Sequence, residues 1–142
     1  MISSIYPEIQ MKTIRVCIAG ATGWAGSELA SAVYDAPDME LVAAISRSYA
    51  GQALGDVIGI AGLTTPVFAT VEDALETRPD VLVEYTKPDV AKHHVVTALK
   101  GGAHVVVGTS GLSNEDYREI EEVALAANRG VLAVGNFAIT AV

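Results

Sequence analysis

The chain has 142 residues, a length typical of one domain, and 51% of them are hydrophobic, which is enough to form a buried core. Its formal net charge of -8 repels phosphate backbones, so we expect no nucleic-acid partner. No apolar run approaches the roughly 18 residues of a membrane helix, and residues 1–10 lack the cationic start of a secretory signal, so we expect no membrane association and a cytoplasmic protein.

Cysteine and histidine give little sign of a metal site. Cys17, the single cysteine, lies in the apolar run IRVCIAG, where a thiol is most often a small buried core group. His93, His94 and His104 do not form a zinc pattern, because adjacent residues of a helix point to different sides. We therefore expect no metal.

The first part of the chain predicts a strand, a glycine turn, a helix and a second strand. Residues 14–19 form an apolar, β-branched run that ends at Gly20, as a buried strand does. Residues 24–34 contain no proline and repeat apolar residues on one helical face. Residues 39–45 form a second strand, and the glycine-rich, weakly periodic residues 46–62 predict a long loop.

The rest of the chain repeats this alternation. Thr70 is placed to cap a helix, and Ser113 with Asp116 resembles a capping box. The pattern predicts strands at residues 67–68, 81–85, 104–108 and 131–134, and helices at residues 71–77, 88–100 and 114–128. It therefore predicts an α/β, doubly wound (Rossmann-type) and mainly parallel sheet with helices on both faces. We expect residues 1–13 to form an N-terminal arm and residues 14–142 to form a dinucleotide-binding domain.

The first functional signal is the turn GATGWAG between the first strand and the first helix. Its G-x-x-G-x-x-G spacing is a variant of the dinucleotide-binding pattern. Gly20 lets the chain turn off the strand, Gly23 lets backbone N–H groups approach a pyrophosphate, and Gly26 lets the helix pack closely on the sheet. The positive helix N-terminus would let an acidic chain hold a diphosphate, while a purely structural turn is the alternative.

The end of the second strand indicates which dinucleotide is bound. NAD-selective domains place an acid there for the ribose hydroxyls, whereas this chain has Ser46 and Arg47. The Arg47 guanidinium suits a 2'-phosphate, so we expect NADPH as the cofactor, with NADH as the other candidate. The alternative is an ordinary solvated arginine.

Three more loops follow predicted strands and should share one edge of the sheet, at residues 85–88 (YTKP), 108–111 (GTSG) and 135–137 (GNF). Ligands of open α/β sheets bind at the carboxyl ends of strands, so we expect these loops to surround a nicotinamide. For Thr109 and Ser110 the alternative is ordinary turn and helix-cap chemistry. Glu84 and Asp89 show no signal beyond strand-end polarity and capping.

Four segments, in order, carry a family resemblance. IRVCIAGATGWAG resembles an opening strand and glycine loop, VEYTKPD a D-F-T-x-P-[DE] segment, VVGTSGLS a V-[VI]-G-T-T-G-[FL] segment, and GNFAITAV an A-x-N-[FM]-S-x-G-V segment. The last three are more specific than the glycine turn. Residues 14–142 therefore resemble the N-terminal nucleotide-binding domain of the dihydrodipicolinate reductase (4-hydroxy-tetrahydrodipicolinate reductase) family.

The resemblance implies an NAD(P)H-dependent reductase that transfers hydride to a cyclic unsaturated dicarboxylate in lysine and diaminopimelate biosynthesis, and a homo-oligomer formed through the substrate domain. It implies pyrophosphate contacts from Gly20, Ala21, Thr22, Gly23, Trp24 and Ala25, and ribose contacts from Ser46 and Arg47. It implies nicotinamide contacts from Gly108, Thr109, Ser110, Val134, Gly135, Asn136 and Phe137. Ser110 would also lie nearest a carboxylate of the substrate.

Several positions depart from the family pattern. The glycine loop commonly reads G-R-M-G, whereas this chain has Trp24 and Ala25, so a phosphate-contacting arginine is absent and we expect Trp24 to pack locally. Tyr85 replaces a Phe, and Ala138 and Thr140 replace a Ser and a Gly. The substrate domain's H-H-x-x-K-x-D-x-P-S-G-T-like run is absent from this sequence. We therefore expect no catalytic residue here and a fragment of a longer enzyme.

Two other interpretations stay open. Semialdehyde dehydrogenases, another group of NAD(P)-dependent dehydrogenases, share a GATGxxG-like turn, but their catalytic cysteine follows the nucleotide domain, whereas Cys17 precedes the turn. A non-catalytic nucleotide- or CoA-binding Rossmann module would use the same strand ends without reducing a substrate.

Overall fold

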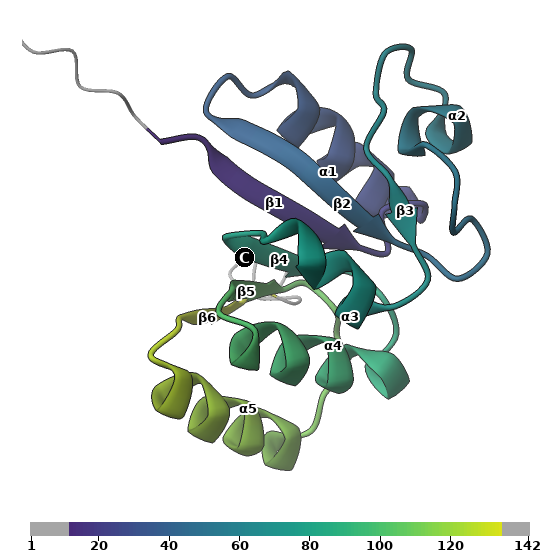
Figure 1. The fold of residues 1–142 in the computed structure, drawn as a ribbon. Helices are drawn as coiled ribbons and strands as arrows, with labels where there is room; N and C mark the ends of the chain where they lie inside the picture. Colours follow the sequence, from purple (N-terminus) through teal and green to yellow (C-terminus); the bar gives the residue numbers. More distant parts are fainter. Residues whose placement is uncertain (1–11, 135–142) are drawn as a thin grey trace, which may run out of the picture.

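The computed structural model of the chain describes residues 12–134, so residues 1–11 and 135–142 lie outside the described part (Figure 1). The strands are β1 (Ile14–Ala19), β2 (Met39–Ile45), β3 (Val67–Phe68), β4 (Val81–Glu84), β5 (His104–Val107) and β6 (Val131–Ala133). They form one parallel sheet in the order β3-β2-β1-β4-β5-β6. The strand order reverses between β1 and β4, which is the arrangement of a Rossmann fold.

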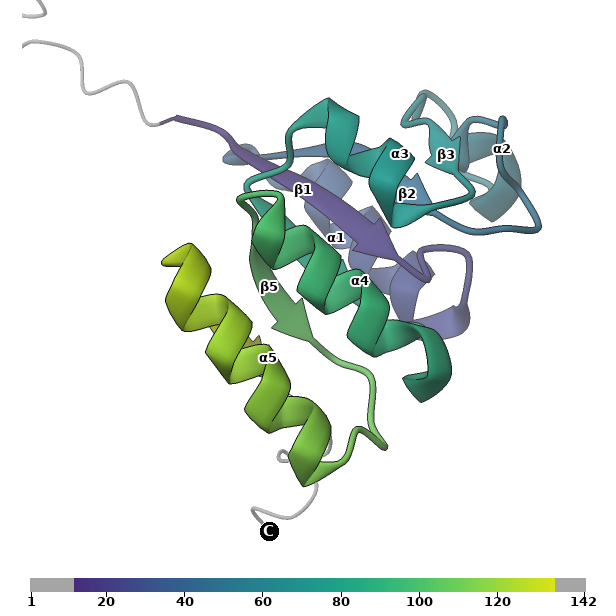
Figure 2. The ribbon, with the colours of Figure 1, turned by 60° about the horizontal axis from the view of Figure 1, so that its bottom comes forward.

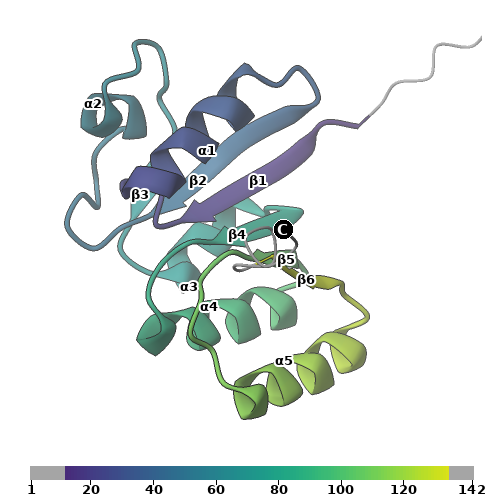
Figure 3. The same cartoon turned by 180° about the vertical axis from the view of Figure 1, so that it is seen from behind.

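Helices cover both faces of this sheet. They are α1 (Trp24–Asp35), α2 (Leu54–Ile58), α3 (Val71–Ala74) with the 3-10 turn η2 (Leu75–Thr77), α4 (Pro88–Lys100) and α5 (Asn114–Ala127). Helices α3, α4 and α5 pack on the face seen in Figure 1, and α1 and α2 pack on the opposite face, seen from behind in Figure 3. Figure 2 shows α4 and α5 side by side. The predicted fold class is confirmed.

Strand β1 shows why the sequence has continuous apolar runs. Cys17 and Ala19 point into the core beneath α3 and α4, whereas Val16 and Ile18 point into the core beneath α1. Successive side chains of a strand alternate between the two faces, and here both faces are covered. A run without polar interruptions is therefore what this position in the sheet requires.

The predicted elements end within one residue of the observed ones, with one exception. Helix α2 lies inside residues 46–62, where the sequence predicted a long loop, so that prediction is wrong for residues 54–58. No side chain caps α2, and its stability comes from tertiary contacts, because Leu54 is fully buried and the backbone N–H of Gly55 donates to the carbonyl of Leu63 at 2.9 Å. Local sequence carries no such information.

Candidate functional site

The carboxyl ends of β1, β2 and β4 meet around a pocket of about 540 Å³. The pocket is lined by Gly20, Thr22, Gly23, Ile45, Ser46, Arg47, Tyr85, Thr86, Lys87, Asp89 and Val90. It lies where the strand order reverses, which is the usual ligand position in open parallel sheets. The fold therefore brings together the glycine turn, the end of the second strand and the loop after the fourth.

Two of the three glycines of the turn have the structural roles that their spacing predicted, and the approach of a pyrophosphate to Gly23 stays a prediction. Gly20 has a φ of +84°, and a Cβ there would collide with the carbonyl oxygen of Tyr85. Gly26 is buried in α1, and a Cβ there would collide with the carbonyl of Gly20. Gly23 differs, because a Cβ there would meet only the Gly20 oxygen, at the ordinary distance of 3.4 Å. The protein itself does not require glycine at position 23.

The N-terminus of α1 is open. Its N-cap residue, Gly23, makes no side-chain cap, and the first turn contains no acidic residue. The longer helix α5 differs, because the Ser113 hydroxyl accepts from the backbone N–H of Asp116 at 3.0 Å and the Asp116 carboxylate completes the capping box. The free N–H groups at the start of α1 lie beside the pocket and favour a negatively charged ligand.

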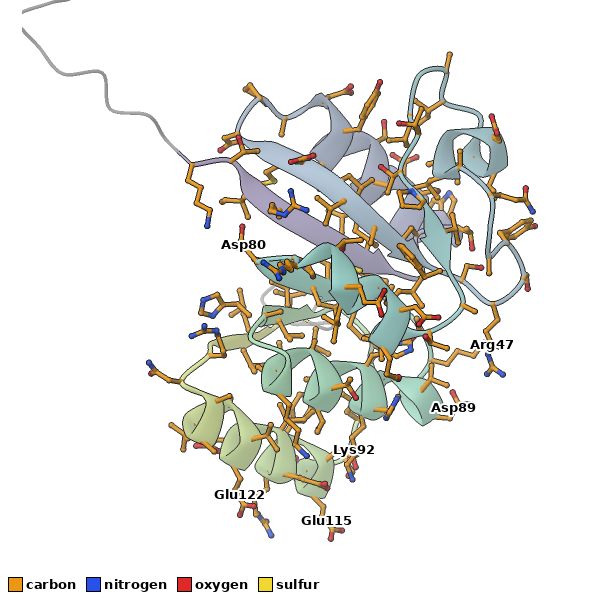
Figure 4. All side chains as sticks on the ribbon, viewed as in Figure 1. Arg47, Asp80, Asp89, Lys92, Glu115 and Glu122 are labelled. Carbon is orange, nitrogen blue, oxygen red and sulfur yellow. The ribbon has the colours of Figure 1, made fainter. Side chains whose placement is uncertain are left out.

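The end of β2 adds hydroxyl and guanidinium groups to the pocket. The hydroxyls of Thr22 and Ser46 lie 3.4 Å apart, which joins the glycine turn to β2. Arg47 is exposed, and Figure 4 shows its side chain extending from the end of β2 on the side of the molecule where Asp89 begins α4. Lys87 provides a second cation. Lys87 belongs to the loop at residues 85–88 that was expected at this edge, whereas Asp89 was expected only to cap a helix.

The loops after β4 and β5 are joined by hydrogen bonds. The buried hydroxyl of Thr109 lies 3.2 Å from the carbonyl of Glu84 and 3.3 Å from that of Thr86. A Cβ at Gly108 would collide with the ring of Tyr85, so glycine is required for this packing. Ser110 is exposed on the same loop. The two loops thus form one surface at the carboxyl edge of the sheet.

Not every predicted site residue lines the pocket. Within the described part of the chain, Ala21, Trp24, Ala25, Gly108, Thr109, Ser110 and Val134 lie outside its lining. Val134 directly follows β6, and its backbone N–H donates to the carbonyl of Val107 at 2.8 Å. Gly135, Asn136 and Phe137 lie outside the described residues. The roles assigned to all these residues stay predictions.

The expectation that Trp24 packs locally is wrong. Its side chain is 86% exposed at the first residue of α1. The buried face of α1 carries Gly26, Ala30 and Val33, at helical spacing from one another, and Trp24 does not belong to it.

Cys17 is fully buried in β1, as predicted. Burial, followed by the negative charge of Glu84, raises the pKa of its thiol to about 12. A thiol with such a pKa holds its proton at neutral pH and cannot serve as a nucleophile. This excludes Cys17 as the catalytic cysteine that a semialdehyde dehydrogenase needs.

Sequence reasoning also missed the role of Glu84. Its carboxylate is fully buried at the end of β4, and Nδ1 of His94 in α4 lies 2.8 Å from its Oε2. The sequence does contain a signal. Glu84 shares the strand face of the buried Leu82, and an acid at a core position requires a partner.

No three His, Cys, Asp or Glu side chains among residues 12–134 are arranged to hold a metal ion. No helix in this same range is long and apolar enough to cross a membrane.

Comparison with known proteins identifies the family. The sequence model described as the N-terminus of dihydrodipicolinate reductase matches residues 14–137. The chain belongs to this family. The 4-hydroxy-tetrahydrodipicolinate reductases of Geobacillus thermodenitrificans and Syntrophomonas wolfei are 40% and 39% identical to it, over 92% and 90% of the chain. The match covers 49% and 48% of these two proteins, so the chain spans about half their length.

Solved structures agree with this assignment. A dipicolinate-bound dihydrodipicolinate reductase from Paenisporosarcina sp. TG-14 is 30% identical with a TM-score of 0.74, and the match covers 91% of this chain and 49% of that one. GenD2 of gentamicin A biosynthesis, solved in complex with NAD, is only 18% identical, with a TM-score of 0.75 over 93% of this chain and 37% of its own. The likeness to GenD2 supports the fold alone.

Proposed function

We propose that this chain is the NAD(P)H-binding domain of a dihydrodipicolinate reductase, and that residues 14–142 form it. The dinucleotide would lie in the pocket at the ends of β1, β2 and β4. The observation that carries this proposal is the open N-terminus of α1 beside the pocket. Its unpaired N–H groups and positive dipole provide a local anion site in a chain whose net charge is -8.

The residues of the glycine turn fit a pyrophosphate. Gly20 and Gly26 are required by contacts within the protein, whereas Gly23 is not. A ligand that passes close to the backbone at Gly23 would account for a glycine there. This favours a bound diphosphate over a purely structural turn.

Arg47 and Lys87 favour NADPH over NADH. Both cations line the pocket, and the lining residues at the end of β2 include no acid for a ribose diol. Titration of the chain with each nucleotide tests the preference. We expect tighter binding of NADPH, and equal or tighter binding of NADH would contradict the proposal.

The substrate we propose is a cyclic unsaturated dicarboxylate. A bound reduced nicotinamide supplies the hydride. Thr109 and Gly108 would form part of the wall behind the ring, and the exposed Ser110 hydroxyl would donate to a substrate carboxylate. The proton would come from a substrate domain of the full-length enzyme, which we propose to be a cytoplasmic homo-oligomer.

The reaction is tested with a full-length protein in which this chain is followed by the proposed substrate domain. We expect oxidation of NADPH that depends on freshly formed dihydrodipicolinate precursor. A folded full-length protein that binds NADPH but oxidises none of it with this substrate would contradict the proposed reaction and favour a non-catalytic nucleotide-binding module.

A further inference from the structure

Glu84 lies in an environment that is unfavourable for a charge. It is fully buried at the end of β4, directly after the apolar residues Leu82 and Val83. Removing a carboxylate from water is costly unless hydrogen bonds and an opposite charge compensate it. An apolar residue would have continued the strand without that cost. Packing alone therefore does not explain why an acidic residue is present at this position.

Both carboxylate oxygens of Glu84 are engaged. Oε1 accepts hydrogen bonds from the backbone N–H of Thr86, at 2.9 Å, and from the Thr86 hydroxyl. Oε2 lies 2.8 Å from Nδ1 of His94. With a carboxylate as the acceptor, Nδ1 is the nitrogen that carries the proton, which fixes the orientation of the imidazole ring.

The partners of Glu84 belong to the candidate site. Thr86 lines the pocket of about 540 Å³ at the ends of β1, β2 and β4. His94 lines an adjoining hollow of about 380 Å³ between α3 and α4, which Arg47 also lines. The two residues meet in a third hollow of about 120 Å³, together with Ser46. One buried carboxylate thus holds residues on two sides of a continuous surface.

The network extends to the loop after β5. The hydroxyl of Thr109 lies within hydrogen-bond distance of the carbonyl oxygens of Glu84 and Thr86. The backbone N–H groups of Gly108 and Thr109 also donate to the Glu84 carbonyl, at 2.9 and 3.1 Å. The loop after β5, where the nicotinamide is proposed to lie, is therefore joined to the backbone of residue 84 and, through the Thr86 carbonyl, to a residue that the Glu84 carboxylate holds.

We propose that Glu84 is a positioning residue for the dinucleotide, and that it acts by fixing Thr86 and His94 on the two sides of the binding surface. This inference rests on the proposed function. Because both of its oxygens are already engaged, Glu84 acts on the ligand through these two residues and not by direct contact. A purely structural acid would contribute to stability and leave nucleotide affinity in the folded protein unchanged.

The test measures NADPH affinity and folding stability separately in four proteins. These are the unmodified chain, Glu84→Gln, which removes the charge but keeps the shape, Glu84→Asp, which keeps the charge on a shorter side chain, and Thr65→Val. Thr65 is buried, and its hydroxyl donates to the Leu41 carbonyl at 2.7 Å, away from the pocket lining. The Thr65→Val variant therefore shows what the loss of a buried hydrogen bond does when that bond lies away from the pocket. The affinity for NADPH is measured by calorimetry under conditions in which each protein is folded, and the stability is measured by urea unfolding.

We expect NADPH to bind about tenfold more weakly to Glu84→Gln, which corresponds to the loss of one hydrogen bond between the ligand and a residue that Glu84 positions. We expect about a threefold loss in Glu84→Asp and unchanged affinity in Thr65→Val despite its lower stability. Unchanged affinity in both Glu84 variants would overturn the inference, as would an equal loss in Thr65→Val. Should Glu84→Gln not fold, Glu84→Asp decides alone. If the unmodified chain binds neither NADPH nor NADH, the proposed function itself fails, which is a distinct result.

Discussion

The side-chain hydroxyls of Thr22 and Ser46 lie 3.4 Å apart and join the glycine turn after β1 to the end of β2. These two segments are separated by helix α1 in the sequence, yet they line the same pocket. In the proposed complex the first would face the pyrophosphate and the second the adenosine ribose. Ser46 is therefore the position at which an acidic residue should change the preference between NADPH and NADH.

Replacing Ser46 by Asp should shift the preference toward NADH. A carboxylate at the end of β2 accepts hydrogen bonds from a ribose diol and repels a 2'-phosphate. We expect the ratio of NADPH to NADH affinity to fall about tenfold, as for one charge-assisted hydrogen bond. Ser46→Ala is the matched control. A ratio in Ser46→Asp equal to that of the control would contradict the placement of the ribose.

Replacing Arg47 by Ala should weaken NADPH binding and leave NADH binding nearly unchanged. The guanidinium is exposed and lines the pocket, so its removal should not disturb the core. We expect about a tenfold loss for NADPH alone. Arg118, which is exposed on α5, provides a control in Arg118→Ala. Equal losses for both nucleotides in Arg47→Ala would show that Arg47 does not read the 2'-phosphate.

Alanine at Gly26 should lower the stability of the protein, whereas alanine at Gly23 should lower its affinity for NADPH. A Cβ at Gly26 would collide with the Gly20 carbonyl, so Gly26→Ala should lower the free energy of unfolding by about 2 kcal/mol or more. A Cβ at Gly23 has room, so Gly23→Ala should change stability by about 1 kcal/mol at most while weakening NADPH binding at least about tenfold. Urea unfolding and calorimetry measure the two quantities. Wild-type affinity in a folded Gly23→Ala variant would favour a purely structural turn.

Cys17 should be unreactive in the native protein and dispensable for binding. Its thiol is fully buried and its pKa is raised to about 12, so almost no thiolate exists at neutral pH. We expect a thiol reagent to label Cys17 only in denaturant, and Cys17→Ala to bind NADPH with unchanged affinity. Rapid labelling of the native chain would show that β1 is less protected than the structure indicates.

The capping box of α5 should make stability depend on pH in the acid range. Hydrogen bonds from Ser113 to the carboxylate of Asp116 lower the pKa of that carboxyl group, and Lys92 acts in the same direction. A group whose pKa is lowered by folding contributes stability at neutral pH and loses it as the pH falls through that pKa. Asp116→Asn should therefore be less stable than the unmodified chain at pH 7, with a difference that disappears in acid. A difference of constant size at all pH values would contradict this origin.

The strands and the long helices could be predicted from the sequence because the pattern of apolar residues within each segment shows which of its residues are buried. Strands with helices on both faces need continuous apolar runs, such as residues 14–19, and Ser113 marks the start of α5 through its own hydrogen bond. Helix α2 could not be predicted because contacts with residues outside the helix stabilise it. The contact between Glu84 and His94 could not be predicted for the same reason, since it depends on how α4 packs on β4.

The exposure of Trp24 has a comparable explanation. Trp24 stands where the family pattern commonly has an arginine, and it does not pack locally because Gly26 and Ala30 set the buried side at the start of α1. A helix residue is buried only if it shares the face that meets the sheet. Which side that is depends on how the glycine turn directs the helix, and this is a property of the folded chain.

The most direct test of the account is an NMR titration of the chain with NADPH, in which the backbone amide signals are assigned. We predict saturable binding, with the largest shifts at Gly20, Gly23, Arg47 and Thr86, and smaller ones at Thr109. The exposed far end of α5, such as Leu125, should not respond. Absence of binding, or shifts confined to residues outside the pocket at the ends of β1, β2 and β4, would contradict the proposal that this pocket holds the dinucleotide.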